Sequence, residues 1–66
     1  MEILLNGRFE TVEEHITVGR LLEQVLPPGR RVAVEVNHEI VPRTRHDDHS
    51  LSPGDRVEIV QAIGGG

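Results

Sequence analysis

Residues 17–26 read Thr-Val-Gly-Arg-Leu-Leu-Glu-Gln-Val-Leu, and their pattern predicts a helix. Apolar residues recur at i, i+3, i+4, i+7 and i+8, the spacing of a helix with one buried face. These residues are Val18, Leu21, Leu22, Val25 and Leu26. Thr17 suits the N-cap, and Pro27-Pro28-Gly29 ends the pattern. The sequence therefore predicts one short helix over 18–26, which must be held in place by packing.

The segment before the helix predicts a β-hairpin. Asn6-Gly7 suits a type I′ turn, because both turn positions need positive φ. Residues 1–5 form the first expected strand. Residues 8–14 form the returning strand, with Phe9 and Val12 as its apolar residues.

Two further strands are expected directly after the helix. Residues 31–37 alternate with period two, which places Val32, Val34 and Val36 on one face. A turn over 37–39 leads to a short strand at Ile40-Val41. Pro42 stops this strand and favours an edge of the sheet, because proline has no N–H to donate.

A polar loop and a final strand complete the chain. Residues 43–50 predict a surface loop with one helical turn, and Leu51 anchors it in the core. Ser52-Pro53-Gly54-Asp55 predicts a β-turn with proline at its second position. Residues 56–63 form the last expected strand.

This order, β-β-α-β-β-β, predicts an α+β fold: a sheet of four to five strands with one helix packed across one face. The helix-facing side is expected to carry Ile3, Leu5, Val34, Val36, Val57 and Ile59. The opposite side is expected to carry Glu2, Leu4, Glu35, Glu58, Val60 and Ala62. Carboxylates among exposed aliphatic side chains indicate either an ordinary solvated face or a surface for docking a partner. We favour docking and extend the predicted surface to Ile63.

Composition narrows the class of protein. The 66-residue length predicts one domain. A net charge of −4 disfavours nucleic acid as a partner, because phosphate binding needs clustered cations. The chain has no cysteine for a disulfide or a nucleophile, and all seven cationic residues are arginine. Without a signal peptide or an apolar run of roughly 20 residues, no membrane association and a cytoplasmic location are expected.

Sites for a metal or a nucleotide are weakly supported. His46-Asp47-Asp48-His49 places two imidazoles three residues apart, but zinc needs three or four ligands. We therefore interpret the histidines as residues of a solvated loop. The glycines form no nucleotide-binding pattern, and a domain this small has no evident cleft. The chain is predicted to bind no metal or cofactor and not to be an enzyme.

The chain ends in Gly64-Gly65-Gly66, directly after an apolar strand. This end is either a terminus without function or the part of the protein that carries its function. Glycines let an extended backbone enter a narrow channel and place a carboxylate at its tip. Residues 1–63 then form the domain by which an activating enzyme recognises a flexible tail at 64–66.

The whole chain resembles the ubiquitin-like β-grasp group and, within it, the ThiS family of sulfur carriers in thiamine biosynthesis. The most specific segment is Asn37-His38-Glu39-Ile40-Val41-Pro42-Arg43. The remaining similar segments are residues 1–7, 17–22, 34–36, 54–60 and 62–66. The small subunit of molybdopterin synthase, a sister family, is usually longer and lacks the 37–43 segment.

The resemblance implies a cycle carried out by partner enzymes. An E1-like, ThiF-type enzyme uses ATP to adenylate the carboxylate of Gly66. Sulfur from a desulfurase relay then converts it to a thiocarboxylate, and a ThiG-type thiazole synthase accepts the sulfur. Gly65 and Gly66 match the family's functional motif. The alternatives are another acceptor (cysteine synthesis, tRNA thiolation or molybdopterin) or a ubiquitin-like protein modifier.

Overall fold

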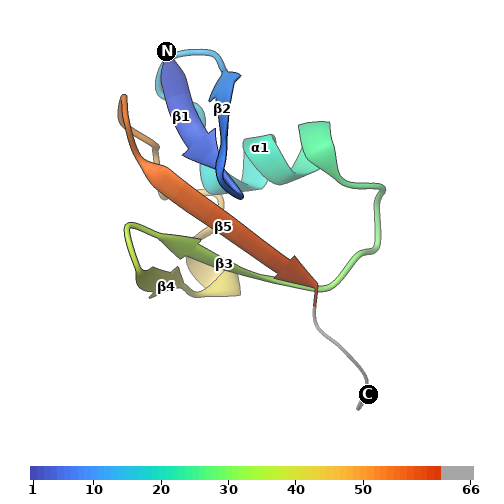
Figure 1. Cartoon of the computed structure of the whole chain (residues 1–66). Coiled ribbons are helices and arrows are strands. Elements are labelled where there is room, and N and C mark those ends of the chain that lie inside the picture. Colours follow the sequence, from blue (N-terminus) through green and yellow to red (C-terminus); the bar gives the residue numbers. More distant parts are fainter. Residues whose placement is uncertain (62–66) are drawn as a thin grey trace.

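The computed structural model describes residues 1–61 and has the predicted order of elements (Figure 1). Its elements are β1 (Glu2–Leu5), β2 (Arg8–Thr11), α1 (Val18–Val25), β3 (Val32–Val36), β4 (Glu39–Val41), the 3-10 helix η1 (Arg43–Arg45) and β5 (Arg56–Gln61). The predicted α+β class and the single helix are thereby confirmed. The last two residues of the predicted final strand and the predicted tail lie outside the described residues.

All five strands form one mixed sheet in the order β2-β1-β5-β3-β4. β5 lies at the centre, parallel to β1 and antiparallel to β3. The other two pairs, β1 with β2 and β3 with β4, are antiparallel. β4 is an edge strand, as Pro42 predicts, and α1 packs on one side of the sheet (Figure 1).

The core lies between α1 and the facing side of the sheet. Its buried residues are Ile3, Ile16, Val18, Leu21, Val34, Val36, Val41, Leu51 and Val57. Partly buried side chains, among them Leu5 and Ile59, pack against this cluster. The predicted helix-facing residues therefore do face the helix, and Leu51 is the predicted anchor of the loop before β5.

Two of the differences from the predicted boundaries concern the elements around α1. β2 ends at Thr11 rather than at residue 14, because the chain turns toward α1 through His15, whose φ is +62°. α1 ends at Val25, and this residue of the predicted apolar stripe is 43% exposed. The buried residues of α1, Val18 and Leu21, both lie in its first turn, so the burial is concentrated at the start of the helix.

The prediction that the histidines lie in a solvated loop is wrong for His46, which is buried. Its ring Nε2 lies 3.1 Å from the carbonyl oxygen of Val41 and donates to it, because a carbonyl only accepts. The loop folds over the start of α1, where the Gly19 N–H donates to His46 O at 2.8 Å and the Val18 N–H to His49 O at 2.9 Å. These carbonyls satisfy N–H groups of the first helical turn and draw the loop inward.

Within residues 1–61, no group of three or more histidine, cysteine, aspartate or glutamate side chains is arranged to hold a metal ion. The same part of the chain contains no helix that is long and apolar enough to cross a membrane.

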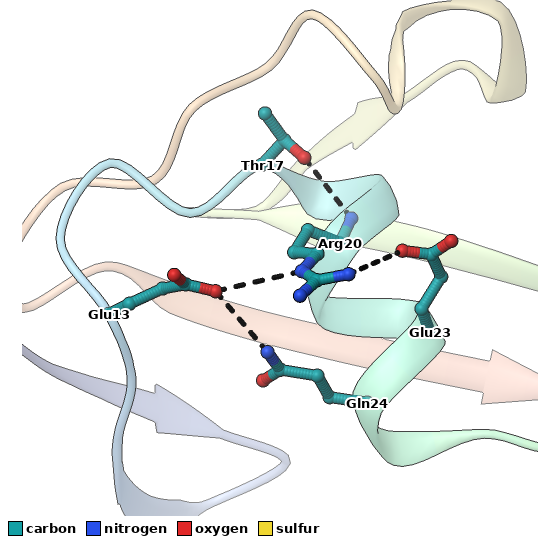
Figure 2. A network of polar contacts seen from close by, with 5 residues as sticks. All are labelled: Glu13, Thr17, Arg20, Glu23 and Gln24. Carbon is teal, nitrogen blue, oxygen red and sulfur yellow. Dashed lines mark hydrogen bonds and ion pairs between the residues drawn. The ribbon is translucent and has the colours of Figure 1, made fainter.

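A polar network joins α1 to the connection that precedes it (Figure 2). Thr17 Oγ1 accepts from the Arg20 N–H at 3.1 Å, which confirms the predicted N-cap. The Arg20 guanidinium pairs with Glu13 at 3.7 Å and Glu23 at 3.4 Å, and Gln24 donates to Glu13 at 3.3 Å. These charges are exposed, so each pair contributes only about 0–1 kcal/mol. The network orients the helix, while burial of Val18 and Leu21 stabilises its packing against the sheet.

Two asparagines in turns hold β5 from both sides. Asn6 has φ +47° and Gly7 has φ +82°, as the predicted type I′ turn requires. Asn6 Oδ1 accepts from the Ile59 N–H at 2.8 Å, and its Nδ2 donates to Ile59 O at 3.3 Å. On the other side, Asn37 Oδ1 accepts from the Arg56 N–H at 2.9 Å. Asn6 thus continues the β1–β5 pairing beyond the end of β1.

We expect Asn6→Gly to lower the free energy of unfolding by about 1–3 kcal/mol, because two hydrogen bonds of roughly 0.5–1.5 kcal/mol each are lost. Asn6→Ala should lose about 1 kcal/mol more, since alanine is strained at positive φ. Urea unfolding followed by circular dichroism measures both. Equal stability of the glycine variant and the unchanged protein would show that the Asn6–Ile59 bonds contribute nothing.

Candidate functional site

The described chain ends where β5 meets the start of β3. Gln61, its last described residue, pairs with Val32, and Val60 pairs with Ala33. The predicted tail residues Gly64, Gly65 and Gly66, together with Ala62 and Ile63 of the predicted docking surface, lie outside the described residues. The candidate site is therefore built from the surroundings of Gln61.

The sheet face away from α1 carries the described members of the predicted docking surface. Side chains alternate along each strand and directly paired residues share a face, so the register places them. This outer face carries Glu2, Leu4, Phe9, Thr11, Ala33, Glu35, Ile40, Arg56, Glu58 and Val60. It contains every described residue of the predicted surface and several that the prediction did not include.

The outer face divides into two halves along β5. The Gly54 N–H donates to Glu2 O at 2.8 Å, and Leu4 pairs with Arg56, so both β1 residues lie beside the start of β5. At about 3.3 Å per residue, Glu2 is roughly 13 Å along the strand direction from Glu58. Glu2 therefore lies apart from the acidic residues near Gln61, whereas Leu4, which pairs with Arg56, lies diagonally across from Glu58 at the border of the two halves.

The half near Gln61 forms a compact surface, which we call the tail-side patch and define as Ala33, Glu35, Ile40, Glu58 and Val60. Ile40 pairs with Glu35, which pairs with Glu58, so these three form a row across β4, β3 and β5. Ile40 is 72% exposed and Val60 is 54% exposed. Sequence reasoning missed Ile40, because Ile40 and Val41 are both apolar and only the β3–β4 register shows which one points outward.

Glu35 and Glu58 stand directly opposite each other on neighbouring strands. Like charges in this arrangement destabilise a sheet. Within residues 1–61, no arginine forms an ion pair with either carboxylate. Arg56, two residues away on the same face, instead has its Nη1 3.4 Å from His38 Nε2. An acidic pair flanked by exposed aliphatic side chains complements a partner surface with a basic residue in an apolar setting.

The other half of the outer face carries an exposed aromatic ring. Phe9, the chain's one aromatic residue, pairs with Leu4 and is 72% exposed. The sequence identified Phe9 only as an apolar residue of the returning strand. Its outward direction follows from pairing with Leu4, because the neighbouring Ile3 is buried in the core.

Comparison with known proteins gives a consistent result. The model of the ThiS family matches residues 3–66. The sulfur carrier protein ThiS of Escherichia coli is 35% identical over the full length of both chains. A thiazole synthase of Paramagnetospirillum magneticum is 39% identical over 66 residues, and the chain spans 20% of its length.

Solved structures show the same fold. The crystal structure of the thiamine biosynthesis protein ThiS from Geobacter metallireducens superposes with a TM-score of 0.86 at 33% identity, covering all of both chains. A solution structure from the same organism superposes with a TM-score of 0.77, covering 88% of that chain. The predicted ubiquitin-like β-grasp fold is thereby confirmed.

We expect Glu58→Gln to raise the free energy of unfolding by roughly 0.2–1 kcal/mol, because it removes the repulsion from Glu35. Glu10→Gln is the matched control, since it makes the same change of charge opposite Ile3 rather than opposite a carboxylate. Urea unfolding at low ionic strength measures both. An equal change in the two variants would mean that the paired carboxylates do not repel each other measurably.

Proposed function

Because the chain belongs to the ThiS family, whose members are small sulfur carriers rather than catalysts, we propose that it carries sulfur on its C-terminal carboxylate for thiamine biosynthesis. The observation that carries this proposal is the full-length similarity to a sulfur carrier in a chain that ends in three glycines. The domain is the part that partners recognise, and Gly66 is the part that reacts.

The proposed chemistry follows from the weakness of a carboxylate as an electrophile. In the first step, the Gly66 carboxylate attacks the α-phosphate of ATP on an E1-like, ThiF-type enzyme and displaces pyrophosphate. In the second step, the terminal sulfur of a persulfide supplied through a desulfurase relay attacks the resulting acyl adenylate, and AMP leaves. A thiol of a partner enzyme then cleaves the acyl disulfide, so that the thiocarboxylate remains on Gly66 and the partner's sulfurs are left as a disulfide. The chain has no cysteine and thus offers no thiol of its own for this transfer. ATP is bound by the activating enzyme, and the carrier itself holds no cofactor.

The tail-side patch is the proposed docking surface, together with Ala62 and Ile63 of the sequence prediction. Three properties support this role. The patch lies beside Gln61, from which the chain continues toward Gly66. It exposes Ile40 and Val60, and it leaves Glu35 and Glu58 without an ion pair inside residues 1–61. A basic partner residue between the carboxylates would remove their repulsion on binding.

Thiazole synthase is the proposed acceptor of the sulfur. The relative from Paramagnetospirillum magneticum bears that name and contains, within its own length, a segment similar to this whole chain. A carrier joined to a synthase in one polypeptide supports direct transfer between the two. This observation favours a ThiG-type acceptor over cysteine synthesis, tRNA thiolation, molybdopterin formation or attachment to proteins.

We expect the intact chain to gain the mass difference of one sulfur replacing one oxygen after incubation with ATP, the activating enzyme of the same organism and a sulfur donor. Fragmentation should place the gain on Gly66. Omitting ATP is the control and should leave the mass unchanged. An unmodified chain, with an activating enzyme shown to be competent on another carrier, would contradict the proposal.

We expect one alanine added after Gly66 to abolish adenylation, because the reacting carboxylate then lies one residue beyond its position in the partner's channel. The domain should stay folded by circular dichroism. ATP–pyrophosphate exchange measures the first step directly. The control is a protease-cleavable extension whose removal restores Gly66 as the terminus and should restore exchange. Normal exchange with the extended chain would show that the tail's end is not recognised.

A further inference from the structure

A basic groove lies beside the start of β3 and borders the tail-side patch at Ala33, which belongs to both surfaces. It is an open cavity of about 320 Å³ whose cationic residues are Arg30, Arg31 and Arg43. Leu22 of α1 and Val32 of β3 provide apolar lining. We call Arg30, Arg31 and Arg43 together with this lining the basic groove.

The groove exists because β4 is short. β4 pairs with β3 only at Val34, Glu35 and Val36, and Pro42 then turns the chain away into η1. The start of β3, at Val32 and Ala33, therefore has β5 on one side and no pairing with β4 on the other. Arg43 follows Pro42 directly, so the turn that ends β4 places the Arg43 guanidinium at the groove.

The groove is basic although the chain as a whole is acidic. The protein has eleven acidic residues and seven arginines, yet no acidic residue lines the groove. Within residues 1–61, ion pairs engage Arg20 and Arg45, and none engages the three groove arginines. The groove thus contains three of the seven arginines, and their guanidinium N–H groups are available to donate hydrogen bonds to a ligand.

The groove lies at the base of the tail. Val32 pairs with Gln61, and Arg31 immediately precedes Val32. Figure 1 shows the end of β5 beside the loop that enters β3. A protein that encloses Gly66 and approaches the surroundings of Gln61 meets both the acidic tail-side patch and the basic groove that borders it.

We propose that the basic groove binds carboxylate side chains of the enzyme that adenylates Gly66, so that the two oppositely charged surfaces fix how the carrier is rotated about its tail. This inference rests on the proposed function. Guanidinium groups pair with carboxylates through two parallel hydrogen bonds, which specify orientation as well as attraction. A carrier rotated about its tail would move both charged surfaces away from their complementary partners, which disfavours that complex.

The test compares charge reversals in steady-state ATP–pyrophosphate exchange with the activating enzyme of the same organism. Arg31→Glu and Arg43→Glu should each raise the KM for the carrier about tenfold, the effect of about 1.4 kcal/mol in binding, with kcat little changed. Arg8→Glu is the matched control: it makes the same charge change on the exposed edge strand β2, and its KM should stay within about twofold of the unchanged protein.

Three further measurements make the test specific. Circular dichroism should show that all three variants are folded. Raising the ionic strength should reduce the difference between Arg31→Glu and the unchanged protein, because salt screens exposed charges. Arg31→Lys should lose less than Arg31→Glu, since it keeps the charge without the paired donors.

Several outcomes would overturn the inference. One is an equal KM for Arg31→Glu and Arg8→Glu. Another is a normal KM in adenylation with a defect only in transfer to thiazole synthase, which would assign the groove to that partner. A third is binding of inorganic phosphate to the isolated chain that is lost in Arg31→Glu, which would make the groove a small-anion site. Failure of the unchanged protein to be adenylated would instead overturn the proposed function.

Discussion

The hydrogen bonding of β5 along both of its edges is the constraint on which the rest of the structure depends. β1 pairs with the first half of the strand, and Asn6 extends that contact to Ile59 through its side chain. β3 pairs with the strand as far as Gln61. Because β5 is central, it sets the register of β1 and β3, and these in turn position β2 and β4. The segment that leads to the tail is therefore the central strand of the sheet.

Local sequence patterns were sufficient to predict the elements. The apolar spacing from Val18 onward and the Thr17 cap located α1, since helix periodicity and capping act over a few residues. Asn6-Gly7 located the first hairpin because few other dipeptides accept two positive φ values. The outward direction of Glu35, Glu58 and Val60 followed from alternation within their own strands.

These local patterns do not predict which strands pair when they are distant in sequence. Nothing in residues 2–5 specifies that they run parallel to β5, so the division of the outer face into two halves could not be predicted. His46 was misassigned because a polar loop is usually solvated, whereas here its carbonyls are drawn to the start of α1. The basic groove depends on where β4 stops relative to β3, and residues 30–31 and Arg43 are distant in sequence.

The central place of the last strand has a consequence for synthesis on the ribosome. β1 emerges first, but its parallel partner β5 emerges last, so β1 and β3 have no strand between them until then. A nascent chain interrupted before β5 lacks the strand that joins the two hairpins, and its apolar faces remain open to proteolysis. Completion of the sheet is thus coupled to synthesis of β5.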